Sequence, residues 1–412
     1  MKKIINLSLI FILIFSLLFS SGCTFGRKKV KLEEATDEVT TEVTREIYSD
    51  NPSWYIEFYS AEKQQYEYMS RREMAMYRSQ YEDCNSTVYK SQLSGLPLLL
   101  YNCFLYAMEN RLISFTVYVK DSDEDYTWIR ELLSLDSPFL EQNYDQYEYI
   151  SKRPGNEHGE RLYIRTDQFG SEKWALKTEA LEKCRSIVAE IPAEYETQLQ
   201  KMEYLYDYVC DNVEYIDYTP SEDRNFLYDA VIKGKTNCDG YSNMLNLLFR
   251  LIGVEACEAM STDKETKTGH TWVVAKIGDN FYNFDPTFED TNEIDSTNRV
   301  YFGFSDSLID TAKMEHGDFR PLCEDTSRDF LYAHAIAKNL TDYEETDKIA
   351  SVIKERKYDG IYETLFVVKT VLTEEHLSSF SETLLYTYGG FYSVNIRWFT
   401  KESYSIVIIN VS

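Results

Sequence analysis

The sequence reads GKTNCDGYSNMLNLLFRLIG at residues 234–253, and the cysteine in this stretch opens a predicted helix. Apolar residues recur at three- and four-residue steps from Tyr241 onward, which predicts a helix over residues 238–252 that Gly253 terminates. A cysteine at a helix N-terminus faces unpaired N–H groups and the positive end of the helix dipole, and both favour the nucleophilic thiolate. Gly240 is expected to leave room for a group that approaches the sulfur. Cys238 is therefore a candidate nucleophile, whereas the alternative interpretation is one more small buried side chain.

A histidine and an aspartate follow in two short β-type segments. Residues 269–277, GHTWVVAKI, predict a strand with His270 near its start, and residues 281–285 predict a second strand. A two-residue loop at 278–279, or a four-residue loop that includes both flanking residues, would make Asp285 the diagonal, same-face neighbour of His270. A lone histidine is more often structural. Here a cysteine, a histidine and an aspartate occur in the order that a nucleophile, a base and an orienting carboxylate require.

Three short blocks together resemble the signature of the transglutaminase-like superfamily, over about residues 175–330. They are Asn237–Tyr241, His270–Trp272 and Asp285–Thr287, and Tyr228–Val231 upstream also fits the bacterial members. The resemblance implies an α+β, papain-like fold, in which the helix led by the cysteine packs on an antiparallel sheet that carries the histidine and the aspartate.

The resemblance also implies a role for each site residue. Cys238 would be the nucleophile, His270 the general base and acid, and Asp285 the carboxylate that orients the imidazole. The backbone N–H of Cys238 is one expected oxyanion donor, and Tyr215 is a candidate for the second. A metal site built from the same three residues is disfavoured because no fourth ligand is apparent. We expect no cofactor.

Composition excludes several classes of protein. The chain has 412 residues, which is enough for two or three packed cores. Its 43 Lys and Arg against 69 Asp and Glu give a net charge of −26, and a nucleic-acid binder would need a basic face instead. With only 8 cysteines, no disulfide framework is expected to hold the fold together.

The N-terminus predicts an extracytoplasmic, membrane-attached protein. Residues 1–22 combine a basic start, an apolar run and small residues, as a bacterial lipoprotein signal peptide does, and Cys23 would be the acylated residue. The alternatives are a plain signal peptide and a membrane-spanning anchor, and the apolar stretch is short for an anchor. Residues 23–50 are rich in Thr and Glu and predict a flexible tether. The chain would then be anchored in the cell membrane through Cys23.

Residues 51–170 predict a small N-terminal α+β domain. It would contain a strand within residues 111–120, a short helix that ends before Ser137, and a turn at 154–156. The acidic run at 121–125 starts like a calcium-binding EF-hand loop but lacks the required Gly and Glu, so we interpret it as a solvated turn.

The remaining chain divides at residue 337. Residues 171–337 predict the transglutaminase-like domain, which begins with two amphipathic helices that would bury Cys184 and Cys210. Residues 338–412 predict a small βαββ domain without a visible site.

These observations predict a lipid-anchored cysteine enzyme that cleaves or transfers amide or peptide acyl groups through a thioester. With water as acceptor it is a peptidase or amidase, and with an amine it is a transglutaminase. Its substrate would be a protein or peptide, with cell-wall peptides among the candidates. The alternative is a catalytically silent module that binds cell-envelope or protein partners.

Overall fold

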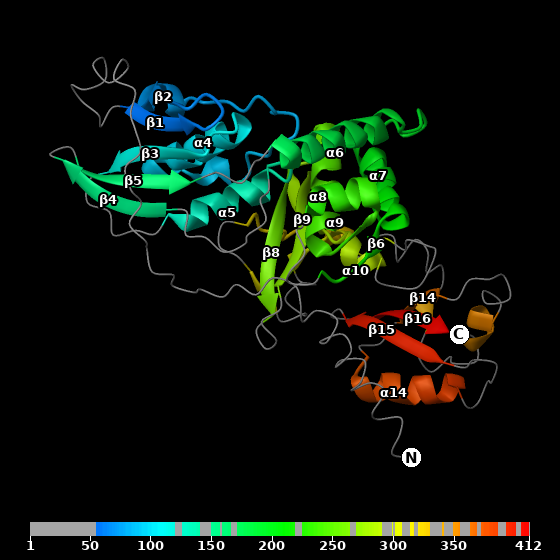
Figure 1. The fold of residues 1–412 in the computed structure, drawn as a ribbon. Helices are drawn as coiled ribbons and strands as arrows, with labels where there is room; N and C mark the ends of the chain where they lie inside the picture. Colours follow the sequence, from blue (N-terminus) through cyan, green and yellow to red (C-terminus); the bar gives the residue numbers. More distant parts are fainter. Residues whose placement is uncertain are drawn as a thin grey trace. The chain divides into compact units, whose positions relative to one another are not determined.

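The structure of the chain is a computed structural model, drawn as a ribbon in Figure 1. It describes residues 55–119, 126–140, 150–156, 159–165, 171–218, 225–263, 269–290, 299, 301–306, 314–316, 320–329, 340–341, 349–354, 363–368, 372–385, 393–400 and 405–411. The predicted signal peptide, Cys23, the tether and the acidic run at 121–125 lie outside the described residues. None of the described helices has both the length and the apolar composition of a membrane span.

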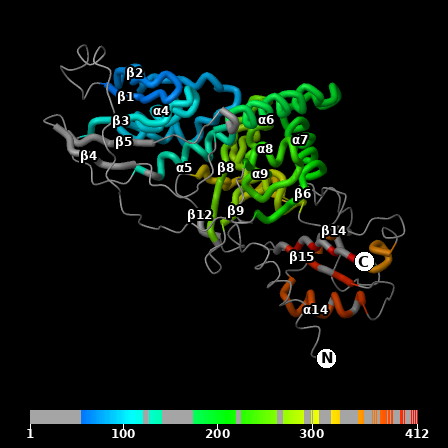
Figure 2. The backbone as a smooth tube through the Cα atoms, in the orientation of Figure 1, coloured from blue at the N-terminus to red at the C-terminus, as the bar shows by residue number. Residues whose placement is uncertain are grey.

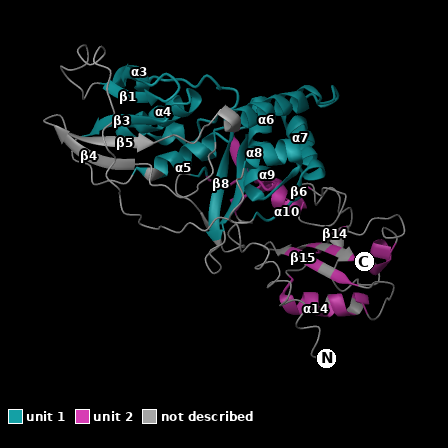
Figure 3. Cartoon of the chain, in the orientation of Figure 1, with its two compact units in different colours: residues 1–278, 314–321 teal, residues 279–313, 322–412 magenta. Residues whose placement is uncertain are grey.

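The chain divides into two compact units, which Figure 3 shows in different colours. The first contains residues 1–278 and 314–321, and the second contains residues 279–313 and 322–412. The described parts of the predicted N-terminal domain therefore share one unit with the cysteine helix and the histidine strand. Each unit is described by itself below.

The first unit begins with an antiparallel sheet of order β2-β1-β3-β5-β4. Its strands are β1 (Tyr55–Ser60), β2 (Gln65–Ser70), β3 (Ser114–Val119), β4 (Ile150–Asn156) and β5 (Gly159–Arg165). Its helices are α3 (Arg71–Ala75), α4 (Gly95–Glu109) and α5 (Thr127–Asp136). Strand β3 and helix α5 confirm the predicted strand and short helix.

The predicted turn at 154–156 is wrong. Pro154 and Gly155 lie inside β4, where the register with β5 shifts between Arg153 and Asn156. Strand β4 is at the edge of its sheet. A proline is tolerated there, because it can fall at an irregularity where no ladder hydrogen bond is needed.

The second half of the first unit surrounds the predicted cysteine helix. Its helices are α6 (Ser171–Ala189), α7 (Gln198–Asn212), α8 (Phe226–Tyr228), a π-helical turn at Asp229–Lys233, and α9 (Cys238–Leu251). Its longer strands are β8 (Ala256–Asp263) and β9 (Gly269–Ile277), and the short strand β12 (Met314–His316) pairs with β8. Helix α9 packs against β8, β9, α6 and α7. The backbone trace in Figure 2 follows this arrangement.

The periodicity-based helix predictions are confirmed in this half. Helices α6, α7 and α9 lie where the apolar stripes predict them, and Cys184 and Cys210 are buried. Every residue of α9 from Cys238 to Phe249 is buried. A helix that is buried on nearly all sides lies inside the core of its unit.

The described strands of the second unit form two groups. The first has β10 (Asn280–Phe284), α10 (Pro286–Asp290) and β11 (Phe302–Phe304), and β10 pairs with β11. The second has a sheet of order β13-β14-β16-β15 and one helix. These elements are β13 (Leu340–Thr341), β14 (Glu363–Val368), α14 (Glu374–Thr383), β15 (Val394–Thr400) and β16 (Ser405–Val411).

The C-terminal part has its own apolar core. Side chains from β14 and β16 pack with α14 and a helical segment at 349–354, and Phe366, Ile353, Leu384 and Ile409 are among them. The order β14-α14-β15-β16 confirms the predicted βαββ elements. The short parallel strand β13, beside β14, was not predicted.

Candidate active site

A pair of short parallel strands fixes the chain just before Cys238. Strand β6 (Glu214–Tyr215) pairs with β7 (Lys235–Thr236), and Ile216 N–H donates to the Thr236 carbonyl at 2.8 Å. Gly234 precedes β7 with φ of +66°, which an L side chain rarely adopts. Residues 234–236 are thus anchored to the chain that follows α7, and the start of α9 has a fixed position.

Gly240 has a different role from the one the sequence suggested. A Cβ at this position would meet Oγ1 of Thr236 at 2.0 Å, so the space beside the glycine is filled by a side chain of the same segment. Thr236 is completely buried. Gly240 therefore allows Thr236 to pack against the start of the helix, and it does not open a path for substrate.

Cys238 is the first residue of α9, as predicted, and only 5% of it is exposed. Its neighbour Asp239 is also buried, and the Asp239 carboxylate accepts from Asn237 Nδ2 at 3.0 Å. The N-terminus of a helix favours negative charge, which makes this a tolerable place for a buried carboxylate. The same dipole and N–H groups act on the Cys238 sulfur.

Strand β9 brings His270 into the same unit. The observed strand matches the predicted bounds, and His270 lies opposite Ser261 of β8. The ring of His270 stacks on that of Trp272, with centroids 6.1 Å apart and planes 19° apart. Thr271 lies between these two residues and donates from Oγ1 to the Asp239 carboxylate at 2.8 Å. The start of the histidine strand is therefore joined to the start of the cysteine helix.

Asp285 lies in the second unit, directly after β10, and is almost completely buried. Its Oδ1 accepts from Phe288 N at 3.0 Å, so this aspartate is the N-cap of α10. Pro286 occupies the first helical position, where a missing N–H costs nothing. The sequence Asp-Pro-Thr thus has a local structural reason, and the pairing of Asp285 with His270 stays a prediction.

Tyr215 lies within electrostatic range of the candidate nucleophile. Burial raises the pKa of the Tyr215 phenol well above its ordinary value, and negative charge on Cys238, Asp217 and Asp239 raises it further. Its ring is 6.5 Å from that of Tyr241. The Tyr215 hydroxyl donates to Asp217 Oδ1 at 3.5 Å, and its role as an oxyanion donor stays a prediction.

A buried polar cluster behind the helix was missed from the sequence. Asn243 Nδ2 is 3.1 Å from each carboxylate oxygen of Glu258 on β8, and Asn246 Nδ2 is 3.4 Å from one of them. All three residues are buried. Asn243 and Asn246 lie about one turn apart in the predicted helix, and this pair is the signal from which such a partner could have been inferred, because a buried amide needs hydrogen bonds.

Residues 185–286 match the family model of the transglutaminase-like superfamily. The match contains Cys238, His270 and Asp285 and covers helix α9 with strands β8, β9 and β10. The chain therefore contains a transglutaminase-like domain, within a mixed helix-and-sheet structure. No curated protein matches the chain.

Several solved structures are similar at low sequence identity. A candidate cysteine protease from Cytophaga hutchinsonii is 14% identical, with 34% of this chain and 61% of that chain covered and a TM-score of 0.22. The periplasmic domain of TgpA from Pseudomonas aeruginosa is 14% identical, with 31% and 53% covered and a TM-score of 0.23. A TGase is 12% identical, with 54% and 63% covered and a TM-score of 0.26. The chain spans less than two thirds of the length of each of these structures.

Proposed function

We propose that this protein is a cysteine enzyme that transfers or hydrolyses amide or peptide acyl groups. The transglutaminase-like domain supports a cysteine-enzyme-like fold. The observation that carries the proposal is the position of Cys238 as the first residue of a buried helix whose next residue is hydrogen bonded to the histidine strand. Cys238 begins helix α9, and His270 lies near the start of strand β9. The hydrogen bond between their neighbours joins these two starts, which supports an interaction between the thiol and the imidazole.

The proposed reaction has two steps. The Cys238 thiolate attacks the substrate carbonyl, the C–N bond breaks, and His270 passes the proton of the thiol to the leaving nitrogen, which leaves a thioester. Water or an amine then attacks the thioester and gives its proton to His270, and the Cys238 sulfur leaves. Asp285 would orient the imidazole, and the Cys238 N–H and Tyr215 would stabilise the oxyanion.

The length of the loop between the two strands supports the role of Asp285. Strand β9 ends at Ile277 and β10 begins at Asn280, so two residues separate them. Gly278, with φ of +63°, suits such a tight turn. If the strands pair as a hairpin, Asp285 lies opposite Trp272 and becomes the diagonal, same-face neighbour of His270.

Thiol reactivity tests the proposal without knowledge of the substrate. We expect alkylation of Cys238 by iodoacetamide to follow a pH profile with a midpoint well below about 8.5, the value of a free thiol. His270→Ala should move that profile up. Cys184 is the internal control, because burial raises the pKa of its thiol and the site should stay unreactive. A Cys238 profile like that of an ordinary thiol, insensitive to His270, would favour the silent binding module instead.

Asp285 requires a substitution that keeps its capping role. Asparagine caps helices as well as aspartate does, so Asp285→Asn should leave stability within about 0.5 kcal/mol of wild type and still lower the turnover of an amide substrate. Asp285→Ala should lose about 1 kcal/mol of stability in addition, because Phe288 N–H loses its acceptor. Thermal unfolding and turnover, measured on both variants, separate the two roles. Unchanged turnover in Asp285→Asn would remove Asp285 from the catalytic set.

We also propose that the chain is attached to the outer face of the cell membrane through acylated Cys23, a proposal that rests on the sequence alone. Cys23→Ala should move the protein from the detergent phase to the aqueous phase in a detergent partition, because the acyl chains supply the attachment. Partition identical to wild type would contradict the anchor without affecting the proposed chemistry.

A further inference from the structure

A buried hydrogen bond joins the cysteine helix to the histidine strand across a large sequence separation. Thr271 Oγ1 donates to Asp239 Oδ1 at 2.8 Å, and each of the two side chains is only 5% exposed. Asp239 follows Cys238 directly, and Thr271 follows His270 directly. We call this pair of residues the 239–271 clamp.

The clamp contains a buried carboxylate, that of Asp239, at a position where an apolar side chain would be easier to bury. A buried carboxylate loses its hydration, and beside a thiolate it also meets a like charge. Its stabilising partners are the Thr271 hydroxyl, the Asn237 amide at 3.0 Å and the positive end of the α9 dipole. An apolar pair of similar volume would avoid these costs. What the polar pair provides instead is a directional contact of fixed length between two elements.

We propose that Asp239 and Thr271 are positioning residues that set the distance between Cys238 and His270; this inference rests on the proposed function. Each clamp residue is one peptide unit from its reactive neighbour, and consecutive Cα atoms are about 3.8 Å apart. The hydrogen bond between residues 239 and 271 therefore holds the backbones of Cys238 and His270 at a fixed distance from each other. On its other side the start of α9 is held by Thr236, which fills the space at Gly240.

The test removes only the hydroxyl. Thr271→Val keeps the branched shape of the side chain but cannot donate to Asp239. We expect the alkylation rate of Cys238 near neutral pH to fall at least about tenfold, the factor that corresponds to loss of one hydrogen bond to a charged group. The pH profile of Cys238 should also move toward that of a free thiol, because the His270 imidazole would no longer be held beside the sulfur. Thr271→Ser keeps the hydroxyl and should restore both quantities.

A second pair of variants keeps the test independent of folding defects. Thr271→Ser and Thr271→Ala both lack the methyl group, so the difference between them reports the hydroxyl even if the valine variant does not fold. Thr116→Val is the matched control, since Thr116 is a buried threonine on strand β3 of the N-terminal sheet. It should leave the rate and the profile of Cys238 unchanged.

The outcomes separate the clamp from the proposed function. If wild-type Cys238 reacts like an ordinary thiol, the proposed function fails and the clamp has nothing to position. If wild-type Cys238 shows the low-pH profile and Thr271→Val and Thr271→Ala leave it unchanged, the clamp is overturned and the proposed function stands. A slower rate with an unmoved pH profile would also overturn it, because that result describes access to the thiol and not the geometry of the pair.

Discussion

Gly240 lies where the first turn of α9 crosses the side chain of Thr236. A methyl group at this position would come within 2.0 to 2.7 Å of three Thr236 atoms. Thr236 cannot move away easily, because it is fully buried and its hydroxyl is 3.3 Å from the Tyr218 hydroxyl. Gly240 was expected to leave space beside the nucleophile. Instead, its contact with Thr236 is part of the packing that holds Cys238 in place.

This packing predicts that Gly240→Ala lowers the free energy of unfolding, the opposite of the usual effect of this substitution in a helix. Alanine in place of glycine inside a helix ordinarily stabilises by about 1 kcal/mol. Here we expect a loss of about 1–3 kcal/mol in the free energy of unfolding, because the new methyl group overpacks a buried contact. Denaturant unfolding of the full chain measures it. The comparison variant is Gly253→Ala, where nothing lies within 4 Å and only the positive φ of +78° opposes a side chain, at a cost of about 1–2 kcal/mol. A gain in stability for Gly240→Ala would show that Thr236 relaxes freely.

At the scale of the elements, sequence periodicity predicted the helices whose apolar residues form a stripe and missed helix α4, whose apolar residues do not. The stripes of α6, α7 and α9 were visible because polar residues separate the apolar ones. Helix α4 was missed because its sequence, GLPLLLYNCFLYAME, is apolar on nearly every side and leaves no stripe. Pro154 and Gly155 indicated a turn, but the edge position of β4 makes both residues compatible with a strand.

The candidate site was predictable to the same extent. The bounds of α9 and β9 were predictable from local patterns. The roles that the three signature blocks imply for the cysteine, the histidine and the aspartate stay a prediction. The 239–271 clamp was not predictable, because its members are 32 positions apart and the chain between them carries no pattern that pairs a threonine with an aspartate. Contacts of this kind depend on tertiary packing and not on local propensity.

The C-terminal end of α5 carries a buried carboxylate that gives the protein a pH-dependent stability. Burial raises the pKa of Asp136 to about 6, although the N–H groups of Tyr89 and Lys90 and the Tyr101 hydroxyl act in the opposite direction. An unfolded aspartate has a pKa of about 3.9. Between these two values the folded state binds the extra proton, so stability falls as the pH rises through this window and stays lower above about pH 6.

We therefore expect Asp136 to lower the free energy of unfolding by about 2 kcal/mol between pH 4 and pH 7, because part of the shift of about two pKa units takes effect below pH 4. Asp136→Asn should flatten this part of the pH dependence, because the amide does not titrate. Thermal unfolding of both proteins across this range measures the difference. Glu109 remains in both proteins, and burial raises its pKa as well, so a smaller slope of the same sign should persist in the variant. A slope that does not change on substitution would assign the pH dependence to other groups.

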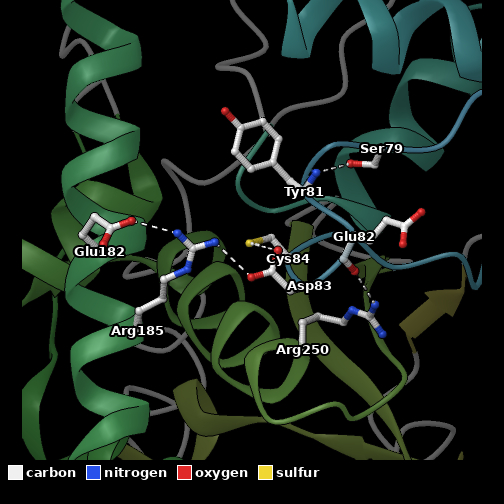
Figure 4. A network of polar contacts seen from close by, with 8 residues as sticks. All are labelled: Ser79, Tyr81, Glu82, Asp83, Cys84, Glu182, Arg185 and Arg250. Carbon is white, nitrogen blue, oxygen red and sulfur yellow. Dashed lines mark hydrogen bonds and ion pairs between the residues drawn. The ribbon is translucent and has the colours of Figure 1, made fainter.

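At the scale of the whole molecule, the cysteine helix is held at its far end by the N-terminal part of the chain. Figure 4 shows the loop that carries Glu82 and Cys84 between two arginines of the transglutaminase-like half. Arg250, near the end of α9, donates to the Asn85 carbonyl at 2.7 Å and to the Glu82 carbonyl at 3.3 Å. Further along the same boundary, the Tyr89 hydroxyl donates to the Glu258 carbonyl at 2.7 Å. The segment that matches the family model, residues 185–286, is therefore hydrogen bonded to residues outside the match.

The two arginines should differ strongly in what they contribute. Arg185 pairs with Asp83 at 2.9 Å, but both side chains are about half exposed, at 41% and 53%, and water screens such a pair. The Arg250 side chain is more buried, its burial lowers the pKa of the guanidinium, and its partners are carbonyls that water would not replace easily. We expect Arg250→Met to lower the free energy of unfolding by about 2–4 kcal/mol and Arg185→Met by less than about 1 kcal/mol. Methionine keeps most of the side-chain stem, so the comparison isolates the charged group.

Because Arg250 belongs to the helix that Cys238 begins, its loss should also speed amide hydrogen exchange along α9, whereas loss of Arg185 should not. Equal losses of stability for both variants would mean that side-chain packing, and not the guanidinium of Arg250, joins the two halves of the first unit.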